Sequence, residues 1–417
     1  MGLRRSRQDT LGSARALDDA DSSSPTSVAA MNAEIKSTTT SPTDGLAPVF
    51  AQYPLEVVHA EGVWLHTRDG RRVLDLYGGH AVAALGYAHA GWTRALSEQA
   101  AACNFQSNAV PMAVRERAAT RLLRFAGGAF DSVFFVNSGA EANENALRMA
   151  FRMTRRPGVV AIEGAFHGRT AAAGALTWGA DKKWYEFPRT PFEVSFLPRR
   201  DLGAIARGIT HETAAVIVEP VQGVGGAFDM GAEYLAALRR RCDEVGALLI
   251  FDEVQIGVGR SGWPFAANMY GVVPDMITTA KALGNGFPCA ALLMQPKVTA
   301  AIKLEGLGTT FGGGPMACAV IEAVLDAIER EDLLANVRRV SDYIRRTCTV
   351  GPVVGHQGAG FLHGLRTSRP AKEVQAALLA RDILCGTSGD PNVVRLLPPY
   401  ILREEHVDVL RAALVSL

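Results

Sequence analysis

From about Tyr53 onward, short apolar runs alternate with amphipathic stretches along the chain. Several runs are apolar at almost every position, which is typical of strands buried on both faces of a sheet. The clearest are SVFFV at 132–136, VVAIE at 159–163, AAVIVEPV at 214–221, ALLIFDEV at 247–254, MITT at 276–279 and ALLM at 291–294. Between them, apolar spacing predicts helices over about 140–153 and 234–245. This alternation predicts an α/β fold with a mostly parallel sheet sandwiched by helices.

The pattern differs on either side of this region. Before it, residues 53–76 suggest short strands joined by the turns HAEG and RDGR. After it, Pro315 suits the start of a long helical region that continues to about Arg346. One face of that region carries Leu333, Leu334, Val337, Val340, Tyr343 and Ile344. VRLLPPYIL and a terminal helix over 404–417 follow.

We therefore expect two domains in one chain. The large domain spans 77–314, and a smaller α+β domain is formed by 315–417 together with the N-terminal segment 47–76. Residues 1–46 are polar, rich in serine and threonine and without periodicity, which predicts a disordered tail. MGLRRS matches a myristoylation pattern, but such short patterns arise often by chance, and Met31 is an alternative start.

Composition excludes several classes of protein. The 43 Lys and Arg balance 42 Asp and Glu, so charge gives no case for nucleic acid or an anionic membrane as a partner. No apolar run reaches the ~18 residues that a membrane span needs. Six scattered cysteines, without a CxxC or a Cys/His cluster, argue against structural zinc and a disulfide framework. We expect a cytoplasmic, enzyme-sized protein with no metal site.

Four predicted strands end in residues that carry chemistry. SVFFV is followed by NSGAEAN, VVAIE by GAFHGRT, ALLIF by DEVQ, and MITT by AKALGNG. In open α/β sheets, functional sites lie beyond the carboxyl ends of the strands. One site should therefore bring together Ser138, Gly139, Ala140, Phe166, Arg169, Asp252, Gln255 and Lys281.

Lys281 and Asp252 suggest the chemistry of this site. A lysine in an apolar setting has its charged form disfavoured, which makes the amine nucleophilic. An aspartate in the same setting is expected to need a cationic partner. From these two residues alone, a buried Asp–Lys salt bridge remains an alternative.

A candidate anion site favours a reactive lysine over a simple Asp–Lys salt bridge. Gly139 and Ala140 open a helix directly after a strand, so their N–H groups and the helix dipole favour a phosphate. Phe166 is placed to stack on a flat ring, although a single phenylalanine is more often part of the core. An aldehyde-accepting lysine, a carboxylate for a ring nitrogen, a phosphate site and a stacking ring together describe pyridoxal phosphate.

Two alternatives come from other classes. GVGRSG, at 257–262, matches the GxGxxG pattern of dinucleotide-binding folds. The segment after it is too short before Pro274 to form the crossover helix, and no acidic residue follows at the required distance. A non-catalytic binding protein on the same scaffold is the second alternative, and it would have no need of Lys281.

From about Tyr53 to its C-terminus, the chain resembles the class III (ω-amino) pyridoxal-phosphate aminotransferases of fold type I, especially the acetylornithine/succinylornithine subgroup. The matching motifs are LDLYGGHAV, NSGAEANENAL, AFHGRT, EPVQG, DEVQ followed by Lys281, GNGFP, GTTFGG and RLLPP. Ala90, Ile256 and Gly314 depart from the common pattern beside the site, which affects substrate fit rather than the reaction.

The resemblance implies roles for individual residues. Ser138, Gly139 and Ala140 would bind the phosphate, Phe166 and Val254 the two faces of the ring, and Gln255 its phenolic oxygen. Asp252 would hold the ring nitrogen, and Lys281 the aldehyde. Thr310 would reach the phosphate of a neighbouring subunit, with Thr309 beside the substrate, so a homodimer with a shared site is expected. Without the resemblance, these threonines look like ordinary turn hydroxyls.

The resemblance also implies a reaction, in which the δ-amino group of an N2-acylornithine passes to 2-oxoglutarate. Arg169 and Arg395 are the candidates for binding carboxylates, although either could form a structural ion pair. In many relatives a glutamate pairs with the arginine that corresponds to Arg395 until the dicarboxylate substrate binds. Val224 stands at the position of that glutamate here. We therefore expect Arg395 to have no acidic partner from this position. Another ω-aminotransferase activity, on ornithine, 4-aminobutyrate or an acyl-lysine, remains the alternative.

Overall fold

The computed structural model describes residues 45, 47 and 49–417. Apart from Gly45, the expected tail over 1–46 lies outside the described residues, as do the myristoylation pattern and Met31. The chain divides into two compact units, Met1–Leu55 and Glu56–Leu417. In the first unit, the described residues adopt turns, bends and irregular backbone. All features below belong to the second unit.

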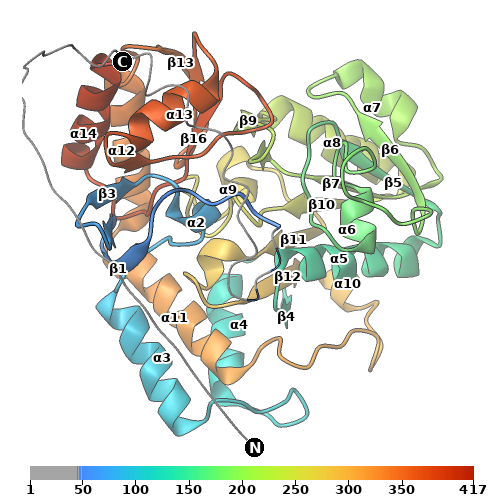
Figure 1. Ribbon diagram of the computed structural model, residues 1–417. Helices are drawn as coiled ribbons and strands as arrows, with labels where there is room; N and C mark the ends of the chain where they lie inside the picture. Colours follow the sequence, from blue (N-terminus) through green and yellow to red (C-terminus); the bar gives the residue numbers. More distant parts are fainter. Residues whose placement is uncertain (1–44, 46, 48) are drawn as a thin grey trace, which may run out of the picture. The chain divides into compact units, whose positions relative to one another are not determined.

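A seven-stranded sheet is the centre of the described chain (Figure 1). Its strands, in spatial order, are β4 (Ser132–Val136), β12 (Ala290–Met294), β11 (Met276–Thr279), β10 (Leu248–Asp252), β7 (Thr213–Val218), β5 (Gly158–Ile162) and β6 (Glu193–Leu197). β12 runs antiparallel to both of its neighbours, and the remaining pairs are parallel. The predicted α/β fold with a mostly parallel sheet is confirmed.

Alternate side chains of these strands enter two separate cores. Ala215 and Ile217 of β7 pack in one core with α5 (Gly139–Thr154). Val216 and Val218 pack in the other with α8 (Ala232–Val245). Because side chains alternate across a strand, apolar residues at every position require a helix layer on each face.

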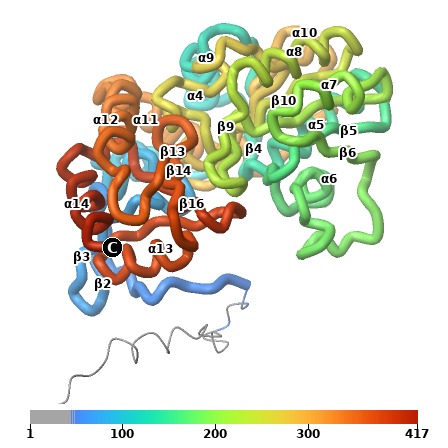
Figure 2. The backbone as a smooth tube through the Cα atoms, turned by 90° about the horizontal axis from the view of Figure 1, so that it is seen from above, coloured from blue at the N-terminus to red at the C-terminus, as the bar shows by residue number. Residues whose placement is uncertain are grey.

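A second group of sheets contains the C-terminal part of the chain. β13 (Val353–Ala359), β14 (Leu362–Thr367) and β16 (Val393–Leu396) form an antiparallel sheet. β3 (Arg72–Asp75) pairs in parallel with β15 (Ile383–Leu384), so an early strand joins a late one. Figure 2 shows the blue strands β2 and β3 beside the red C-terminal elements.

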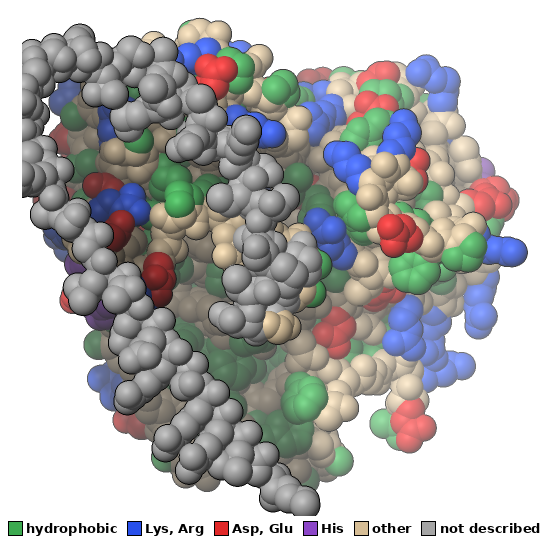
Figure 3. Space-filling model, in the orientation of Figure 1, with side chains coloured by type: hydrophobic (Ala, Val, Ile, Leu, Met, Phe, Trp, Pro, Cys, Tyr) green, Lys and Arg blue, Asp and Glu red, His purple; other side chains and the backbone are tan. Residues whose placement is uncertain are grey.

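The other elements are β1 (Val57–Glu61), β2 (Trp64–Thr67), α2 (Gly78–Ala81), α3 (Ala90–Ala102), α4 (Ala113–Phe125), α6 (Ala171–Ala175), α7 (Leu202–Gly208), β8 (Val221–Gln222), β9 (Phe228–Asp229), α9 (Ala266–Tyr270), the 3-10 turn η1 (Lys281–Leu283), α10 (Pro296–Thr299), α13 (Ala371–Leu379) and α14 (Glu404–Val415). None of the helices in the described part of the chain is long and apolar enough to cross a membrane. Charges of both signs are intermixed on the face drawn in Figure 3.

The long helical region predicted after Pro315 is confirmed, and it consists of two helices, α11 (Pro315–Arg330) and α12 (Leu333–Thr347). Asp332, the N-cap of α12, has a positive φ of 48°, which interrupts the helical backbone although the apolar pattern continues. One local prediction was wrong: the turn assigned to HAEG is centred one to two residues later, because His59, Ala60 and Glu61 belong to β1.

Arg260, from the GVGRSG run, is the largest fully buried side chain of the described residues. Its guanidinium donates to the carbonyls of Ala81, Phe361 and Pro398, at 3.0, 3.3 and 3.0 Å. These carbonyls belong to the segment of α2, the β13–β14 turn and the chain after β16. The run therefore holds an internal arginine that connects distant segments, and no crossover helix starts at its glycines.

Replacing Arg260 with methionine should destabilise the protein strongly, because three buried carbonyls lose their donor. We expect a loss of about 3 kcal/mol or more and a clear fall in Tm, measured by thermal unfolding. The control is Arg68→Met, since Arg68 forms an exposed ion pair with Glu56 and such pairs contribute about 0–1 kcal/mol. Equal shifts in the two variants would contradict the role assigned to Arg260.

Candidate active site

The carboxylate of Asp252 ends β10 and is only 4% exposed. Its Oδ2 accepts hydrogen bonds from Asn143 Nδ2 and His167 Nδ1, both at 2.8 Å. Its Oδ1 accepts from the backbone N–H of Val254 at 3.1 Å. One buried carboxylate therefore connects the NSGAEAN, AFHGRT and DEVQ motifs, as expected for strand ends that share one edge of the sheet.

Lys281 lies at the same edge, just after β11. Its φ of 47° is in the left-handed region, which is unfavourable for a residue with a side chain. The turn after it is held by Trp92 Nε1, which donates to the Gly284 carbonyl at 3.0 Å, and by Asn285 Oδ1, which accepts from the Leu85 N–H at 2.8 Å. This support from neighbouring segments fixes the strained backbone at the lysine.

Burial lowers the pKa of the Lys281 amine, while the charges of Asp252 and Glu219 oppose that shift. Arg395 and Arg260 add to the lowering because they are cations. Among the described residues, Lys281 forms no ion pair, so the buried Asp252–Lys281 salt bridge is not observed. A larger neutral fraction makes this amine a better nucleophile and proton acceptor.

The start of α5 forms the candidate anion site. Ser138 caps the helix, since its side chain accepts from the Glu141 N–H at 3.2 Å. The first N–H groups of a helix have no partner within the helix, which applies to Gly139 and Ala140. A Cβ on Gly139 would lie 2.6 Å from Val254 Cγ2, so only glycine allows Val254 to pack here.

Glu219, from EPVQG, links the positions of Phe166 and Gln255. Its Oε1 accepts from the Phe166 N–H at 2.8 Å, and its Oε2 from the Gly223 N–H at 3.1 Å. A Cβ on Gly223 would lie 1.5 Å from Gln255 Oε1, so the glutamine lies directly on the glycine. That Oε1 is buried and has no hydrogen-bond partner among the described residues. Burial raises the pKa of Glu219 to about 7.

The two candidate carboxylate-binding arginines differ in their surroundings. Arg395, on β16, is 6% exposed. It donates from Nε to the Thr387 carbonyl at 2.7 Å and from Nη2 to Tyr77 Oη at 3.1 Å, while Nη1 has no partner in the described chain. Arg169 is exposed, and its Cζ lies 4.6 Å from the centroid of the Trp184 ring. Val224 supplies no carboxylate and is 39% exposed.

The two threonines of GTTFGG are placed differently from each other. Thr309 Oγ1 accepts from Asn137 Nδ2 at 3.3 Å, beside the start of α5. Thr310 is exposed and forms no hydrogen bond with the other predicted site residues in the described part of the chain. The structure thus gathers the residues around Asp252 and the start of α5, and leaves Arg169 and Thr310 at the surface of the single chain.

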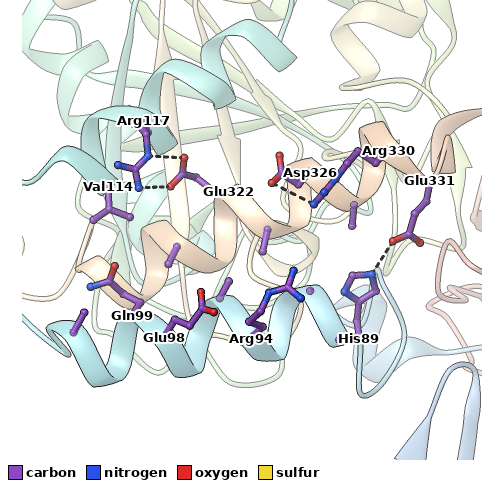
Figure 4. A pocket seen from close by; sticks show the side chains of 17 residues that line it. His89, Arg94, Glu98, Gln99, Val114, Arg117, Glu322, Asp326, Arg330 and Glu331 are labelled. Carbon is purple, nitrogen blue, oxygen red and sulfur yellow. Dashed lines mark hydrogen bonds and ion pairs between the residues drawn. The ribbon is translucent and has the colours of Figure 1, made fainter.

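A groove between α3, α4 and α11 lies away from this site (Figure 4). It has a volume of about 940 Å³ and contains none of the predicted site residues. Six of its charged side chains pair with one another, as Arg117 with Glu322, Arg330 with Asp326 and His89 with Glu331. Arg94 and Glu98 also line the groove, but both are exposed, unlike the buried Arg395.

Sequence reasoning assigned no role to Asn143, His167, Glu219 or Tyr77. Each lies within one of the motifs that the sequence analysis named. Its position in the motif, rather than its residue type, could have indicated a role at the site. Asn143 is four residues after Gly139 and hence on the same helix face, which points it at the end of β10. A buried polar residue at such a position should have been expected to bond Asp252.

Comparison with known proteins agrees with this architecture. The crystal structure of ornithine aminotransferase from Toxoplasma gondii matches with a TM-score of 0.82 and 26% identity, over 88% of this chain and 90% of that one. The acetylornithine aminotransferase of Streptomyces coelicolor is 42% identical over 365 residues, covering 86% and 90% of the two chains. Acetylornithine aminotransferase 1 of Bradyrhizobium diazoefficiens is 39% identical over 376 residues, covering 87% and 92%.

The fold is therefore that of the fold type I transaminases, with the candidate site at the carboxyl edge of its parallel strands. The family model of the class-III aminotransferases matches residues 47–417, and the chain belongs to that family. It is an aminotransferase, as predicted, and membership implies dependence on pyridoxal phosphate.

The raised pKa of Glu219 predicts a pH-dependent contribution to stability. Between about pH 4.5 and about 7, the folded protein retains a proton that the unfolded chain has released. Raising the pH through this window therefore destabilises the wild type, whereas Glu219→Gln has no such titration. The Tm of the wild type minus that of the variant should fall through the window and then level off in thermal melts of the apoprotein. A difference that rises with pH would contradict this assignment.

Proposed function

We propose that this aminotransferase transfers the δ-amino group of an N2-acylornithine, acetylated or succinylated, to 2-oxoglutarate, giving N-acyl-glutamate 5-semialdehyde and glutamate in arginine biosynthesis. The acetylornithine aminotransferases at 39% and 42% identity support the donor. The observation that carries the acceptor is the buried Arg395, whose Nη1 is unpaired among the described residues. A buried guanidinium edge without an acceptor is suited to a carboxylate.

The residues of the site fit pyridoxal phosphate. The N–H groups at the start of α5 suit its phosphate, and the buried carboxylate of Asp252 suits a protonated ring nitrogen. Gln255 Oε1 is buried and has no hydrogen-bond partner among the described residues, so it is available to accept a hydrogen bond from a bound ligand. Phe166 and Val254 would enclose the ring. When bound, the cofactor supplies a sink for the electrons released when the substrate's δ-carbon loses a proton.

Lys281 is proposed both to hold the cofactor's aldehyde carbon in the resting enzyme and, when its amine is free of that carbon, to move the proton. Its amine, with a pKa lowered by burial, would take the proton from the δ-carbon of the substrate. Asp252 is assigned a different role: among the described residues, its Oδ1 accepts only from the Val254 N–H and retains a lone pair for the N–H of a protonated ring nitrogen. Its fixed negative charge instead supports a proton on the ring nitrogen.

Substrate recognition is proposed to use both arginines. Arg395 has no acidic partner among the described residues, and Val224 provides none, so it is open to the α-carboxylate of 2-oxoglutarate or glutamate. Arg169 would hold the other carboxylate of glutamate and the α-carboxylate of the acylornithine. Ornithine would bring an additional ammonium into a site for a neutral amide, and burying it unpaired costs several kcal/mol, roughly.

We further propose a cytoplasmic homodimer in which Thr310 reaches the phosphate site of the partner subunit. The exposure of Thr310 and of the neighbouring Phe311, at 66%, supports a covered surface in the assembly.

Replacing Asp252 with asparagine tests the electrostatic role. The variant keeps the shape but loses the charge, so we expect kcat to fall by about 10²–10³-fold, with a smaller effect on cofactor affinity. Single-turnover kinetics and cofactor titration measure the two effects separately. Turnover close to that of the wild type would exclude a role for Asp252 as the ring-nitrogen partner.

A substrate panel tests the proposed donor. We expect kcat/KM for N2-acetylornithine or N2-succinylornithine to exceed that for ornithine and for 4-aminobutyrate by at least about tenfold, since a few kcal/mol separate the donors. Arg169→Ala should reduce this preference by raising KM for the acylornithine. Preference of the wild type for ornithine would replace this proposal by the general ω-aminotransferase activity.

A further inference from the structure

The loop between α6 and β6 places an indole ring against Arg169. The Arg169 Cζ lies 4.6 Å from the centroid of the Trp184 ring, within the range of a cation–π contact. Trp184 is partly buried, while Arg169 is exposed. Among the described residues, the Arg169 side chain has no ion pair or hydrogen bond, so this cation–π contact is its main interaction.

The backbone beside Arg169 is fixed by the helix that forms the anion site. Glu144 of α5 accepts from Thr170 Oγ1 at 2.6 Å and from the N–H groups of Ala172 and Ala173 at 2.8 and 3.2 Å. A single carboxylate thus attaches the start of α6 to α5. The backbone next to Arg169 is consequently fixed relative to α5, whose start is the proposed phosphate site.

The indole is also fixed. Gly174 on α6 has no side chain, and a Cβ there would lie 3.3 Å from the Trp184 ring and 3.1 Å from Tyr185. Tyr185 Oη donates to the Ala171 carbonyl at 2.7 Å, and the backbone N–H of Trp184 donates to the Ala180 carbonyl at 2.9 Å. The ring is therefore held over the same short helix that begins just after the arginine.

Stacking uses only the flat face of a guanidinium. Its N–H groups point outward in the plane of the group, so a stacked arginine keeps its donors for a carboxylate. An exposed arginine without such a contact would lose rotamer freedom when it binds a ligand. A contact with the indole face through the flat face of the guanidinium would remove part of that loss beforehand and leave the N–H edge free for a carboxylate.

We propose that Trp184 is a positioning residue that presents Arg169 to the α-carboxylate of the amino donor and so determines KM for the acylornithine. This inference rests on the proposed function, in which Arg169 binds that carboxylate. It assigns to the α6–β6 loop a role in substrate recognition, through an arginine that the loop itself does not contain.

Steady-state kinetics of the holoenzyme with N2-acetylornithine test the inference. Trp184→Leu should raise KM about five- to tenfold and leave kcat within about twofold. Trp184→Phe keeps a flat ring and should remain within about twofold of the wild type. The matched control is Trp178→Leu, because Trp178 lies in the same loop region and packs on Phe196 instead of an arginine.

A double-mutant cycle separates positioning from general damage. In the Arg169→Ala background, Trp184→Leu should change KM no further, because the ring then has nothing to position. Arg169→Lys keeps the charge but loses the flat group, so its KM should resemble that of Trp184→Leu. An equal rise in KM in both backgrounds, or a fall in kcat with KM unchanged, would overturn the inference.

The failure of the proposed function gives a different result. If the wild type does not turn over N2-acetylornithine, the donor assignment fails, and the cycle is then measured with glutamate, whose second carboxylate Arg169 is also proposed to hold. If the wild type uses N2-acetylornithine and Trp184→Leu has no effect on KM, the donor assignment stands and the role of Trp184 is wrong.

Discussion

A charge at Asp252 can exist in the interior only if the protein supplies the hydrogen bonds that water would otherwise supply. Asn143, His167 and the Val254 N–H supply them, and they come from a helix, a loop and a turn at three different strand ends. Because an unpaired buried carboxylate is so unfavourable, these segments have little freedom to move apart. Asn143 is itself fixed, since its Oδ1 accepts from Thr278 on β11 at 2.7 Å. The network therefore extends to the strand that leads into Lys281.

The same constraint explains the placement of the glycines. Val254 directly follows the buried DE pair, and it fits only because Gly139 presents no side chain at the start of α5. Gly223 likewise has no side chain where Gln255 packs. Close backbone approach at these two positions brings a helix start and a loop up to the carboxylate. Steric requirements and electrostatic requirements thus select the same arrangement of segments.

The sequence predicts the central sheet well because strands buried on both faces must be apolar at every position, as in β7 and β10. It also predicts one edge as the location of the site, since parallel strands end together. Side-chain partners are harder to predict. The contact between Arg169 and Trp184 depends on how a loop returns over α6, and no periodicity encodes that path. The break at Asp332 was missed because the apolar pattern continues through it. The roles of Lys281, Asp252 and the remaining site residues stay predictions.

Arg395 and Tyr77, which share a hydrogen bond, are 318 residues apart in the chain. The proposed carboxylate-binding end of the site thus requires both an early and a very late segment, whereas Asp252, Asn143 and His167 all lie in the central part. During synthesis, the ribosome releases the proposed cofactor-binding motifs well before Arg395 exists. Contacts over such separations also close large loops, which slows folding. The order of translation therefore makes the proposed cofactor site and Arg169 available first and the proposed carboxylate site at Arg395 last.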